Sequence, residues 1–378
     1  MPPTVLILTQ AGDVHAHAVD IALRQKGIES RLYFSSDFPS RETESVLFRD
    51  RRKLLWLGTL GAVAEEEIRT VWRRRPAYVL DRDKLHPSDR QFAEWQCMAF
   101  RSALFDVLAP QAFWVNRPEV AARASRKILQ HQLALEVGLS VPETLYSNDP
   151  NAIRCFLRRQ GGEGVYKTFL SMVWEAPDTH WLPYTSRVSE GDLVEDAILR
   201  AVPGIYQALV PKAFELRVTF IGKRAFAARL LSQQTSDGQL DWRQAYGELR
   251  MEPHTLSPAV AERCWRLMKA FGLNFGCFDF VVTPEGEHVF LEVNEMGQWL
   301  FIETETGMPL LDAFCSFLAT GSVEYTCDDR AEVRYADVMA ETKAAAEASS
   351  SEHVEAAGGV AKEGVGESER LSVSEPAG

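Results

Sequence analysis

The sequence predicts a mixed α/β (α+β) fold in which a parallel sheet comes first and antiparallel sheets follow. Near the N-terminus, short apolar runs that favour β-structure alternate with segments of helical periodicity, which is typical of a parallel sheet. From residue 215 onward, strand-like segments follow one another through short turns, which is typical of antiparallel hairpins. The chain has 378 residues, of which 46% are hydrophobic, enough for two or three domains with sizeable cores.

The first part of the chain is predicted to form the parallel sheet. Residues 4–9 are a continuous run of apolar β-formers, as in a buried parallel strand. Helical periodicity follows and ends at Gly27, a residue suited to the left-handed conformation that closes a helix. The expected strands are 4–9, 30–34, 77–80 and 113–115, and the expected helices are 14–25 and 88–108.

The remainder is predicted to contain a long helix, three short strands, and two antiparallel hairpins separated by another helix. Pro118 and Gly138 delimit the long helix. Gly222 and the following lysine indicate the turn of the first hairpin, and Ser257 is a suitable N-cap for the second helix. The expected helices are 118–137 and 258–271, and the expected strands are 144–146, 164–170, 205–210, 215–221, 224–232, 274–283 and 288–295.

The C-terminal segment differs in composition from the rest. Beyond Cys327 the chain is rich in Ala, Glu, Ser and Gly, and Tyr335 is its last aromatic residue. From Asp328 to Gly378 there are 12 acidic and 5 basic side chains, which account for −7 of the total charge of −12. A segment of this kind has few residues with which to build a core. We therefore expect residues 323–378 to be a flexible acidic tail.

Net charge and cysteine pattern argue against several classes of protein. A charge of −12 disfavours a protein that wraps nucleic acid or coats an anionic membrane, although a local basic pocket for phosphates is compatible with it. The 6 cysteines include no CxxC pair, so neither a disulfide framework nor a zinc knuckle is expected. We find neither a signal-peptide pattern nor an apolar stretch of roughly 18 residues. We expect a cytoplasmic protein that works without nucleic acid or membrane.

Two acidic residues in the second hairpin are the strongest candidates for chemistry. If Thr283 pairs with His288, Asp279 falls opposite Glu292, and strand alternation places Asn294 on the same face. Two carboxylates that face each other among apolar residues repel. A hard cation such as Mg²⁺, bridging nucleotide phosphates, would remove this repulsion. The alternative is a solvated face with a shifted register.

Two lysines are candidate phosphate ligands. Lys167 interrupts an otherwise apolar strand and needs a partner there, for which a phosphate and a structural ion pair are equally suitable. Lys127 lies in the expected long helix, where an ordinary exposed lysine is the simpler interpretation.

Two further pairs of charged residues have a structural and a functional interpretation each. Glu215 and Arg217 share one face of a strand, where they form a mutual or cross-strand salt bridge or bind ribose and phosphate. Arg243 either anchors an anion or packs beside Asp241 in a stabilised turn. The three consecutive arginines at 73–75 could form a basic patch, but a solvated helix end is the simpler interpretation.

The order of these parts resembles the ATP-grasp ligases. The shared features are Lys127 on a helix, Lys167 on a strand, an apolar linker strand at 206–210, Glu215 and Arg217 two residues apart, and Asp279 followed by Glu292-x-Asn294. The resemblance covers roughly residues 4–320. It implies an ATP-grasp fold preceded by a parallel α/β domain.

More specific motifs resemble the microviridin-type ligases that mature graspetides, ribosomal peptides crosslinked through side-chain esters or amides. These motifs lie at 72–76, 241–243, 290–299 and 306–309, together with Glu303. The implied domains are an N-terminal α/β domain at 1–116, a central subdomain at 117–203, a C-terminal subdomain with a magnesium site at 204–322, and the tail at 323–378.

The resemblance also implies a role for each matching residue. The nucleotide would be bound by Lys127, Lys167, Gln207, Ala208, Leu209, Val210, Glu215 and Arg217. The Mg²⁺ ions would be held by Asp279, Glu292 and Asn294, and catalysis would depend on Arg217 and Arg243. Ala208 departs from the family pattern because an acidic residue is usual there, so the resemblance implies one contact to adenine fewer.

The implied activity is ATP-dependent ligation through an acyl phosphate. It would join Glu or Asp to Thr, Ser or Lys side chains of a precursor peptide, whose leader would bind near the aromatic-rich segment 170–188. The family also implies a homodimer. One alternative is an ATP-grasp ligase that adds amino acids to a protein or small-molecule acceptor, and another is a non-catalytic binder with the same fold.

Overall fold

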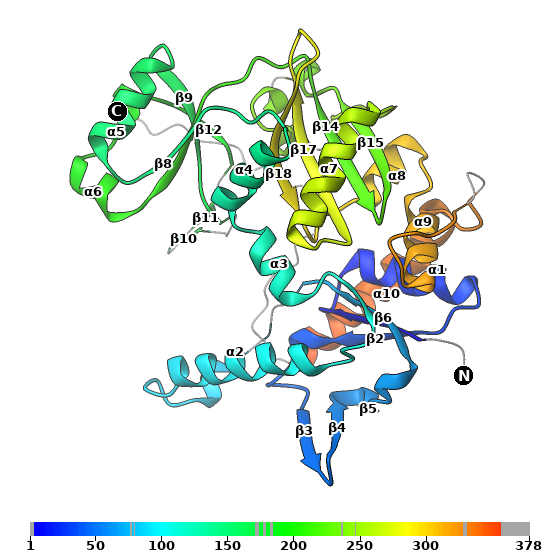
Figure 1. Cartoon of the computed structure of the whole chain (residues 1–378). Helices are drawn as coiled ribbons and strands as arrows, with labels where there is room; N and C mark the ends of the chain where they lie inside the picture. Colours follow the sequence, from blue (N-terminus) through cyan, green and yellow to red (C-terminus); the bar gives the residue numbers. More distant parts are fainter. Residues whose placement is uncertain are drawn as a thin grey trace.

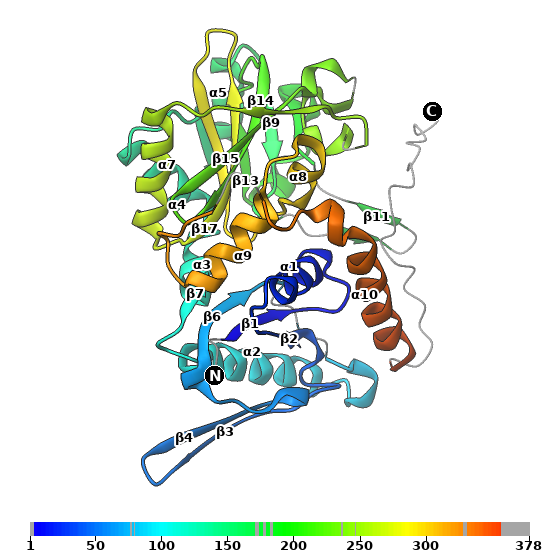
Figure 2. The same cartoon turned by 90° about the vertical axis from the view of Figure 1, so that its right-hand side faces the viewer.

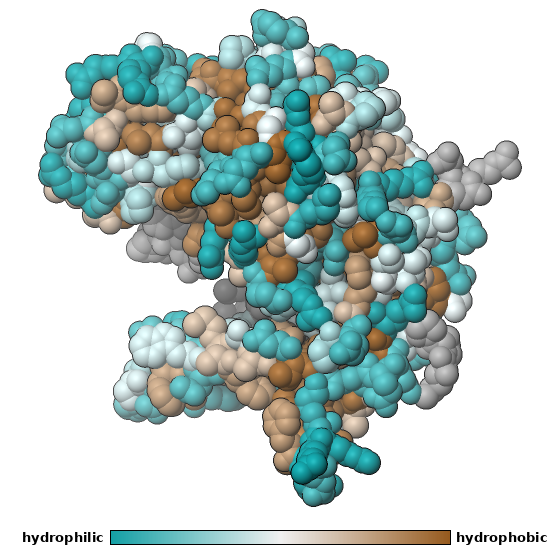
Figure 3. All heavy atoms as spheres, viewed as in Figure 1, coloured by the Kyte–Doolittle hydropathy of each residue, from teal (hydrophilic) through white to brown (hydrophobic). Residues whose placement is uncertain are grey.

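The computed structural model describes residues 4–75, 78, 80–170, 174–176, 179–181, 184–235, 237–245, 247–327 and 331–356. Its N-terminal sheet lies below two antiparallel sheets in the view of Figure 1. The space-filling view in Figure 3 shows a hollow between the part built on helix α2 (Arg90–Val107) and the part built on helices α5 (Pro150–Arg159) and α6 (Asp196–Ala201).

The N-terminal sheet is parallel, as predicted, with strand order β2-β1-β6-β7. Helix α1 (Val14–Gln25) packs on one face, and α2 packs on the other. The strands are β1 (Thr4–Thr9), β2 (Ser30–Phe34), β6 (Ile68–Arg73) and β7 (Phe113–Val115).

The third parallel strand was predicted in the wrong place. The expected strand 77–80 lies partly outside the described residues, and its described members Tyr78 and Leu80 are not in a strand. Strand β6 takes its place: its buried residues Thr70, Val71 and Trp72 are consecutive, and Arg69 and Arg73 on either side shorten the apolar run in the sequence. The arginine run at 73–75 is therefore the end of a strand and not a helix end, and Arg74 is 2% exposed.

A small antiparallel sheet that the sequence analysis missed extends from the N-terminal domain. Its strands are β3 (Glu44–Arg49), β4 (Arg52–Leu57) and β5 (Gly61–Ala62).

The expected long helix 118–137 is two helices, α3 (Pro118–Ala124) and α4 (Lys127–Glu136). Arg126 has extended backbone angles (φ −75°, ψ 102°) and interrupts the helix. The interruption turns α4 toward strand β18 (His288–Asn294), which it packs against, and Lys127 becomes the first residue of the second helix.

The central sheet is antiparallel with strand order β12-β9-β13-β8. Its strands are β8 (Thr144–Ser147), β9 (Glu163–Lys167), β12 (Ser186–Ser189) and β13 (Gly204–Gln207), and α5 and α6 cover it. Within the segment 170–188, strands β10 (Trp174–Ala176) and β11 (Thr179–Trp181) pair as an antiparallel hairpin.

The C-terminal sheet has five antiparallel strands in the order β16-β15-β14-β17-β18 and is covered by helix α7 (Pro258–Phe271). Its strands β14 (Phe214–Ile221) and β15 (Arg224–Leu230) form the first predicted hairpin, and β17 (Phe275–Val282) and β18 form the second. Strand β16 (Met251–His254) adds to the far edge.

The expected flexible tail is wrong for its first part. Helix α10 (Tyr335–Ala356) lies alongside α1 in Figure 2. Its residues Tyr335 and Val338, and Val333 just before it, are buried in the same core as α1 and helices α8 (Leu300–Thr306) and α9 (Leu310–Thr320). Residues 357–378 lie outside the described part. No helix in the described ranges is long and apolar enough to cross a membrane.

Candidate active site

A cavity of about 420 Å³ lies between the central and C-terminal sheets. Its volume is within the usual range for small-molecule and cofactor sites. Every residue that the sequence analysis placed in the site lines it. These residues are Lys127, Lys167, Gln207, Ala208, Leu209, Val210, Glu215, Arg217, Arg243, Asp279, Glu292 and Asn294.

The opposed carboxylates are confirmed, although one step of the register argument is wrong. Asp279 on β17 pairs with Glu292 on β18, as predicted. His288, however, pairs with Val282 and not with Thr283, and a β-bulge between Asp279 and Phe280 makes up the difference. A bulge inserts one residue into one strand, so it restores the predicted pairing beyond it.

The two carboxylates have different electrostatic surroundings. Burial opposes the ionisation of Glu292, but the charge and hydrogen bond of Lys127 outweigh it and lower the pKa of Glu292 to about 2. Asp279 accepts a hydrogen bond of 2.7 Å from Nη1 of Arg217. Burial and the neighbouring charge of Glu292 nevertheless raise its pKa. The pair therefore still has charge repulsion that an additional cation would relieve.

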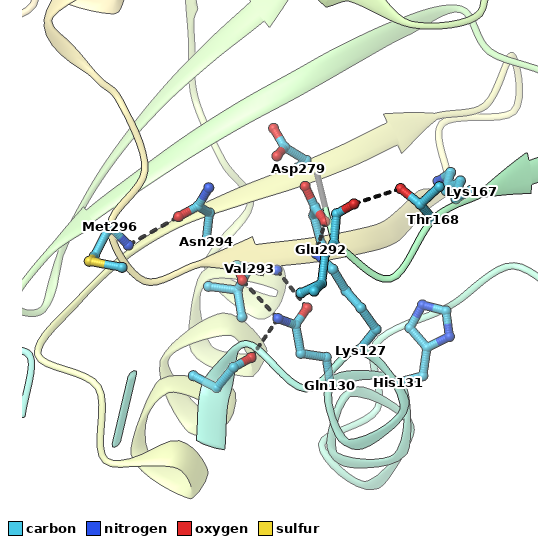
Figure 4. A network of polar contacts seen from close by, with 12 residues as sticks. Lys127, Gln130, His131, Lys167, Thr168, Asp279, Glu292, Val293, Asn294 and Met296 are labelled. Carbon is cyan, nitrogen blue, oxygen red and sulfur yellow. Dashed lines mark hydrogen bonds and ion pairs between the residues drawn. The ribbon is translucent and has the colours of Figure 1, made fainter. Parts of the chain in front are cut away.

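These residues fit a magnesium site of the kind that oxygen ligands form. Asp279, Glu292 and Asn294 lie together in Figure 4, and all three line the cavity. The side-chain oxygen of Asn294 accepts a hydrogen bond of 3.0 Å from the Met296 amide, which orients it. No cluster of three or more His, Cys, Asp or Glu residues suited to a metal occurs among the described residues, so the site depends on two carboxylates and an amide.

Lys167 also lines the cavity, where it is hydrogen-bonded in series with the linker strand β13. Its Nζ donates to the side chain of Gln207 over 2.9 Å, and Gln207 in turn donates to Thr144 over 2.9 Å. Burial lowers the pKa of Lys167 because it penalises the charged amine. Among the described residues its partner is a neutral amide, so its positive charge remains available to an anion.

Glu215 and Arg217 do not pair with each other. Glu215 is bound by Lys212 over 2.8 Å and by the hydroxyl of Ser232 over 3.0 Å. Burial raises its pKa. Arg217 makes the cross-strand salt bridge to Asp279. The structural interpretation of Arg217 is thus confirmed, and the same geometry places its guanidinium in the cavity.

Arg243 is likewise in a turn with Asp241 and in the cavity. Two of its nitrogens bond the two oxygens of Asp241 over 2.8 and 2.5 Å, a bidentate arrangement. Its guanidinium carbon lies 5.8 Å from the centre of the Tyr184 ring. The hydrogen bonds to Asp241 raise its pKa, so the group stays charged.

Several residues that line the cavity were not predicted from the sequence. His131 is one turn after Lys127 on α4 and lies 2.8 Å from the hydroxyl of Tyr146. Burial lowers the pKa of His131, so it is neutral at pH 7. The spacing of four residues from Lys127 is a signal that could have identified His131. Lys212 and Gln298 were also missed.

No family model and no curated protein matches the chain, but solved structures do. The macrocyclase MdnB from Microcystis aeruginosa is 31% identical, with a TM-score of 0.70, and the match covers 84% of this chain and 99% of that one. A RiPP-associated ATP-grasp ligase from Chryseobacterium gregarium, in complex with ADP and a leader and core peptide, is 22% identical, with a TM-score of 0.76 and coverage of 85% and 97%.

A third similar structure is the ATP-grasp ligase PsnB complexed with a minimal precursor, Mg and ADP. It is 22% identical, with a TM-score of 0.66, and the match covers 84% of this chain and 97% of that one. The fold is thus that of the ATP-grasp ligases, among which PsnB is complexed with Mg and ADP.

The 31% identity over nearly the whole of MdnB narrows the class further. The chain belongs to the graspetide-maturing ATP-grasp ligases, the family of that macrocyclase.

Proposed function

We propose that this protein uses ATP to crosslink the side chains of a ribosomal precursor peptide. It would activate a Glu or Asp carboxylate as an acyl phosphate and join it to a Thr, Ser or Lys side chain as an ester or amide. The observation that carries this proposal is the opposed pair Asp279 and Glu292, which lies in one cavity with Lys127 and Arg217.

The reaction has two steps. The substrate carboxylate attacks the terminal phosphate of ATP, which forms the acyl phosphate and releases ADP. The hydroxyl or amine then displaces phosphate and loses its proton. Bound Mg²⁺ and ATP would supply charge neutralisation and the activated phosphoryl group. The protein's own task is positioning and electrostatic stabilisation, which Lys127, Arg217 and Arg243 can perform.

Each part of the cavity has a task in this proposal. Asp279, Glu292 and Asn294 would hold Mg²⁺, and Lys127 and Lys167 would bind phosphates. The backbone at 207–210 would pair with adenine, and Glu215 would accept a hydrogen bond from a ribose hydroxyl. Arg243 would hold the acyl phosphate or the acceptor carboxylate, because its bidentate bond with Asp241 keeps the guanidinium in place beside the cavity.

The partner would be a precursor peptide with a leader and a core. Support comes from the family and from the C. gregarium relative, whose structure contains both peptide parts. We infer that the hairpin β10–β11 contributes to leader binding, because it lies in the segment that leads from Lys167 on β9 to β12. A homodimer, a cytoplasmic location and domain boundaries near residues 116, 203 and 322 remain predictions.

Mass spectrometry of a co-expressed precursor peptide tests the proposal. We expect the peptide to lose one water per crosslink, and we expect no loss when the enzyme carries Asp279→Asn. A precursor that gains mass would instead indicate a ligase that adds amino acids. An unmodified precursor, with ATP still consumed, would contradict peptide crosslinking.

A further inference from the structure

Gln130 lies where α3, α4 and β18 meet, and it is 1% exposed. Its Nε2 donates to the carbonyl of Ala124 over 2.6 Å and to the carbonyl of Val293 over 2.9 Å. Its Oε1 accepts from the amide of Val293 over 3.0 Å. The side-chain amide therefore uses both its donor and its acceptor on the backbone of the strand that carries Glu292 (Figure 4).

These contacts satisfy backbone groups that would otherwise be unpaired. Strand β18 is at the edge of its sheet, so half of its amides and carbonyls point away from β17. The side-chain amide of Gln130 hydrogen-bonds both the amide and the carbonyl of Val293, as the backbone of a neighbouring strand would. The carbonyl of Ala124, at the end of α3, is also one that a helix terminus leaves unpaired. One side chain thus supplies hydrogen bonds both to the edge of strand β18 and to the end of helix α3.

Val293 stands between Glu292 and Asn294, the two residues of β18 proposed to bind Mg²⁺. Lys127 lies three residues before Gln130 on α4 and bonds the carboxylate of Glu292 directly. Helix α4 therefore contacts this stretch of β18 in two ways, through the backbone of Val293 and through the side chain of Glu292. A shift of the strand edge would move both proposed ligands relative to Asp279.

We propose that Gln130 is a positioning residue for the magnesium site, acting through the backbone of Val293. This inference rests on the proposed role of Glu292 and Asn294 as metal ligands. It adds that their placement depends on a neutral amide outside the cavity, which contacts neither nucleotide nor metal. Outer contacts of this kind typically change metal affinity or activity about 10- to 100-fold when they are removed.

The test compares Gln130→Met with Gln132→Met, which places the same substitution two residues on, at an exposed position of the same helix. Both variants keep a flexible side chain of similar length, and only the first loses contacts to β18. We expect the Mg²⁺ concentration for half-maximal turnover to rise about 10-fold or more in Gln130→Met. We expect no change in Gln132→Met, and little change in the KM for ATP at saturating Mg²⁺.

Hydrogen exchange provides a second measurement, which does not depend on turnover. In the wild-type protein the Val293 amide should exchange slowly despite its position on an edge strand, and in Gln130→Met it should exchange faster. Fast exchange in the wild type would refute the contact. If Gln130→Met merely lowers the melting temperature and leaves the Mg²⁺ dependence unchanged, Gln130 is structural and the proposal is wrong.

Failure of the underlying function would give a different result. If Glu292→Gln turns over with wild-type Mg²⁺ dependence, Glu292 is not a ligand and the proposed site is wrong. If Glu292→Gln changes that dependence and Gln130→Met does not, only the positioning inference fails.

Discussion

Two buried arginine–carboxylate pairs of nearly equal length occupy different regions of this molecule. Arg74 bonds Asp13 over 2.8 Å just beyond the ends of strands β6 and β1, and Arg217 bonds Asp279 over 2.7 Å in the cavity. Both arginines are almost fully buried. The pairs differ in what else surrounds each carboxylate, and this difference separates a structural ion pair from a functional one.

Asp13 is fully engaged by its own neighbours. Thr9 donates to it over 2.7 Å, and the amide of His15 donates over 3.2 Å. Burial opposes its ionisation, but the charge and hydrogen bond of Arg74 outweigh burial and lower its pKa from 3.8 to about 2. Arg74 in turn reaches the carbonyl of Met296 over 3.4 Å, which ties the N-terminal domain to the loop after Asn294.

Asp279 is bonded by Arg217 alone among the described residues, and it faces a second carboxylate. Burial and Glu292 therefore raise its pKa although an arginine is adjacent. A buried ion pair whose carboxylate is fully hydrogen-bonded by protein groups contributes to folding. A pair beside a second carboxylate keeps excess negative charge, which a bound cation would neutralise.

The largest expected effect follows from replacing the carboxylate in the cavity. Asp279→Asn should lower the rate of precursor crosslinking roughly 10³-fold, about 4 kcal/mol in the barrier, because a ligand of the catalytic metal is lost. It should change the melting temperature little, because the relief of repulsion with Glu292 offsets the loss of the charge partner of Arg217. Steady-state kinetics and thermal unfolding check both parts. A variant that is inactive because it is unfolded would contradict the comparison.

The structural pair should give the opposite result. Arg74→Met leaves Asp13 buried without its charge partner, so we expect the free energy of unfolding to fall by about 3–5 kcal/mol. Denaturant titration measures this value. Turnover per folded molecule should stay within a few-fold of wild type. The double variant Arg74→Met with Asp13→Asn is the control, and it should recover part of the lost stability.

The sequence identified the cavity residues better than it identified what positions them. The opposition of Asp279 and Glu292 was predicted because both lie in one hairpin, although the register assumed at the turn was wrong and the β-bulge beside Asp279 compensates for it. The helix break before Lys127 could not be predicted in the same way, since its reason is contact with Glu292 and Val293 far along the chain. Residues that bond across such distances leave no local pattern.

The missed C-terminal helix has a similar explanation. Helix α10 is rich in alanine, which indicates little core-forming capacity when it is taken alone. It packs on α1, whose Ala16, Ala18 and Ala22 are fully buried, so small residues on both helices allow a close approach. The hydroxyl of Ser349 also lies 3.0 Å from the ring of His17. Amino-acid composition cannot show that two helix faces made of small residues are complementary in shape.

A third buried carboxylate, that of Glu303, is bonded by a residue of α10. Glu303 is 4% exposed and accepts hydrogen bonds from the amides of Tyr335 over 2.7 Å and Leu311 over 2.6 Å. Burial raises its pKa in spite of these donors. Like Asp13, it is satisfied within the fold, and one of its donors belongs to α10.

A chain that ends at Cys327 should therefore lose stability. This truncation removes the amide of Tyr335 that bonds Glu303, and it exposes the face of α1 that α10 covers. We therefore expect the free energy of unfolding to fall by an amount on the order of 3 kcal/mol. The melting temperature measures the change. A chain that ends at Ala356 keeps every contact described for α10 and is the matched control. Equal melting temperatures for the two truncations would show that α10 does not contribute to folding.

The smallest effect concerns stability in acid. The folded-state pKa of Asp13 is about 2, below its ordinary value of 3.8, so Asp13 favours folding when ionised. Its contribution, about 2–3 kcal/mol, is present above pH 4 and is lost as the pH falls through 2. The pKa of Asp279 is raised, so its contribution has the opposite sign: it is present at low pH and is lost as the pH rises through the folded-state pKa.

Unfolding free energies of wild type, Asp13→Asn and Asp279→Asn, measured against pH in EDTA, separate the two carboxylates. The difference between wild type and Asp13→Asn should grow from pH 2 to pH 4 in favour of wild type. The difference for Asp279→Asn should change in favour of the variant as the pH rises, because the buried, repelled carboxylate is then ionised. If the two differences changed in the same direction with pH, the Arg74–Asp13 and Arg217–Asp279 pairs would be electrostatically equivalent. The distinction drawn here between a structural ion pair and a functional one would then be wrong.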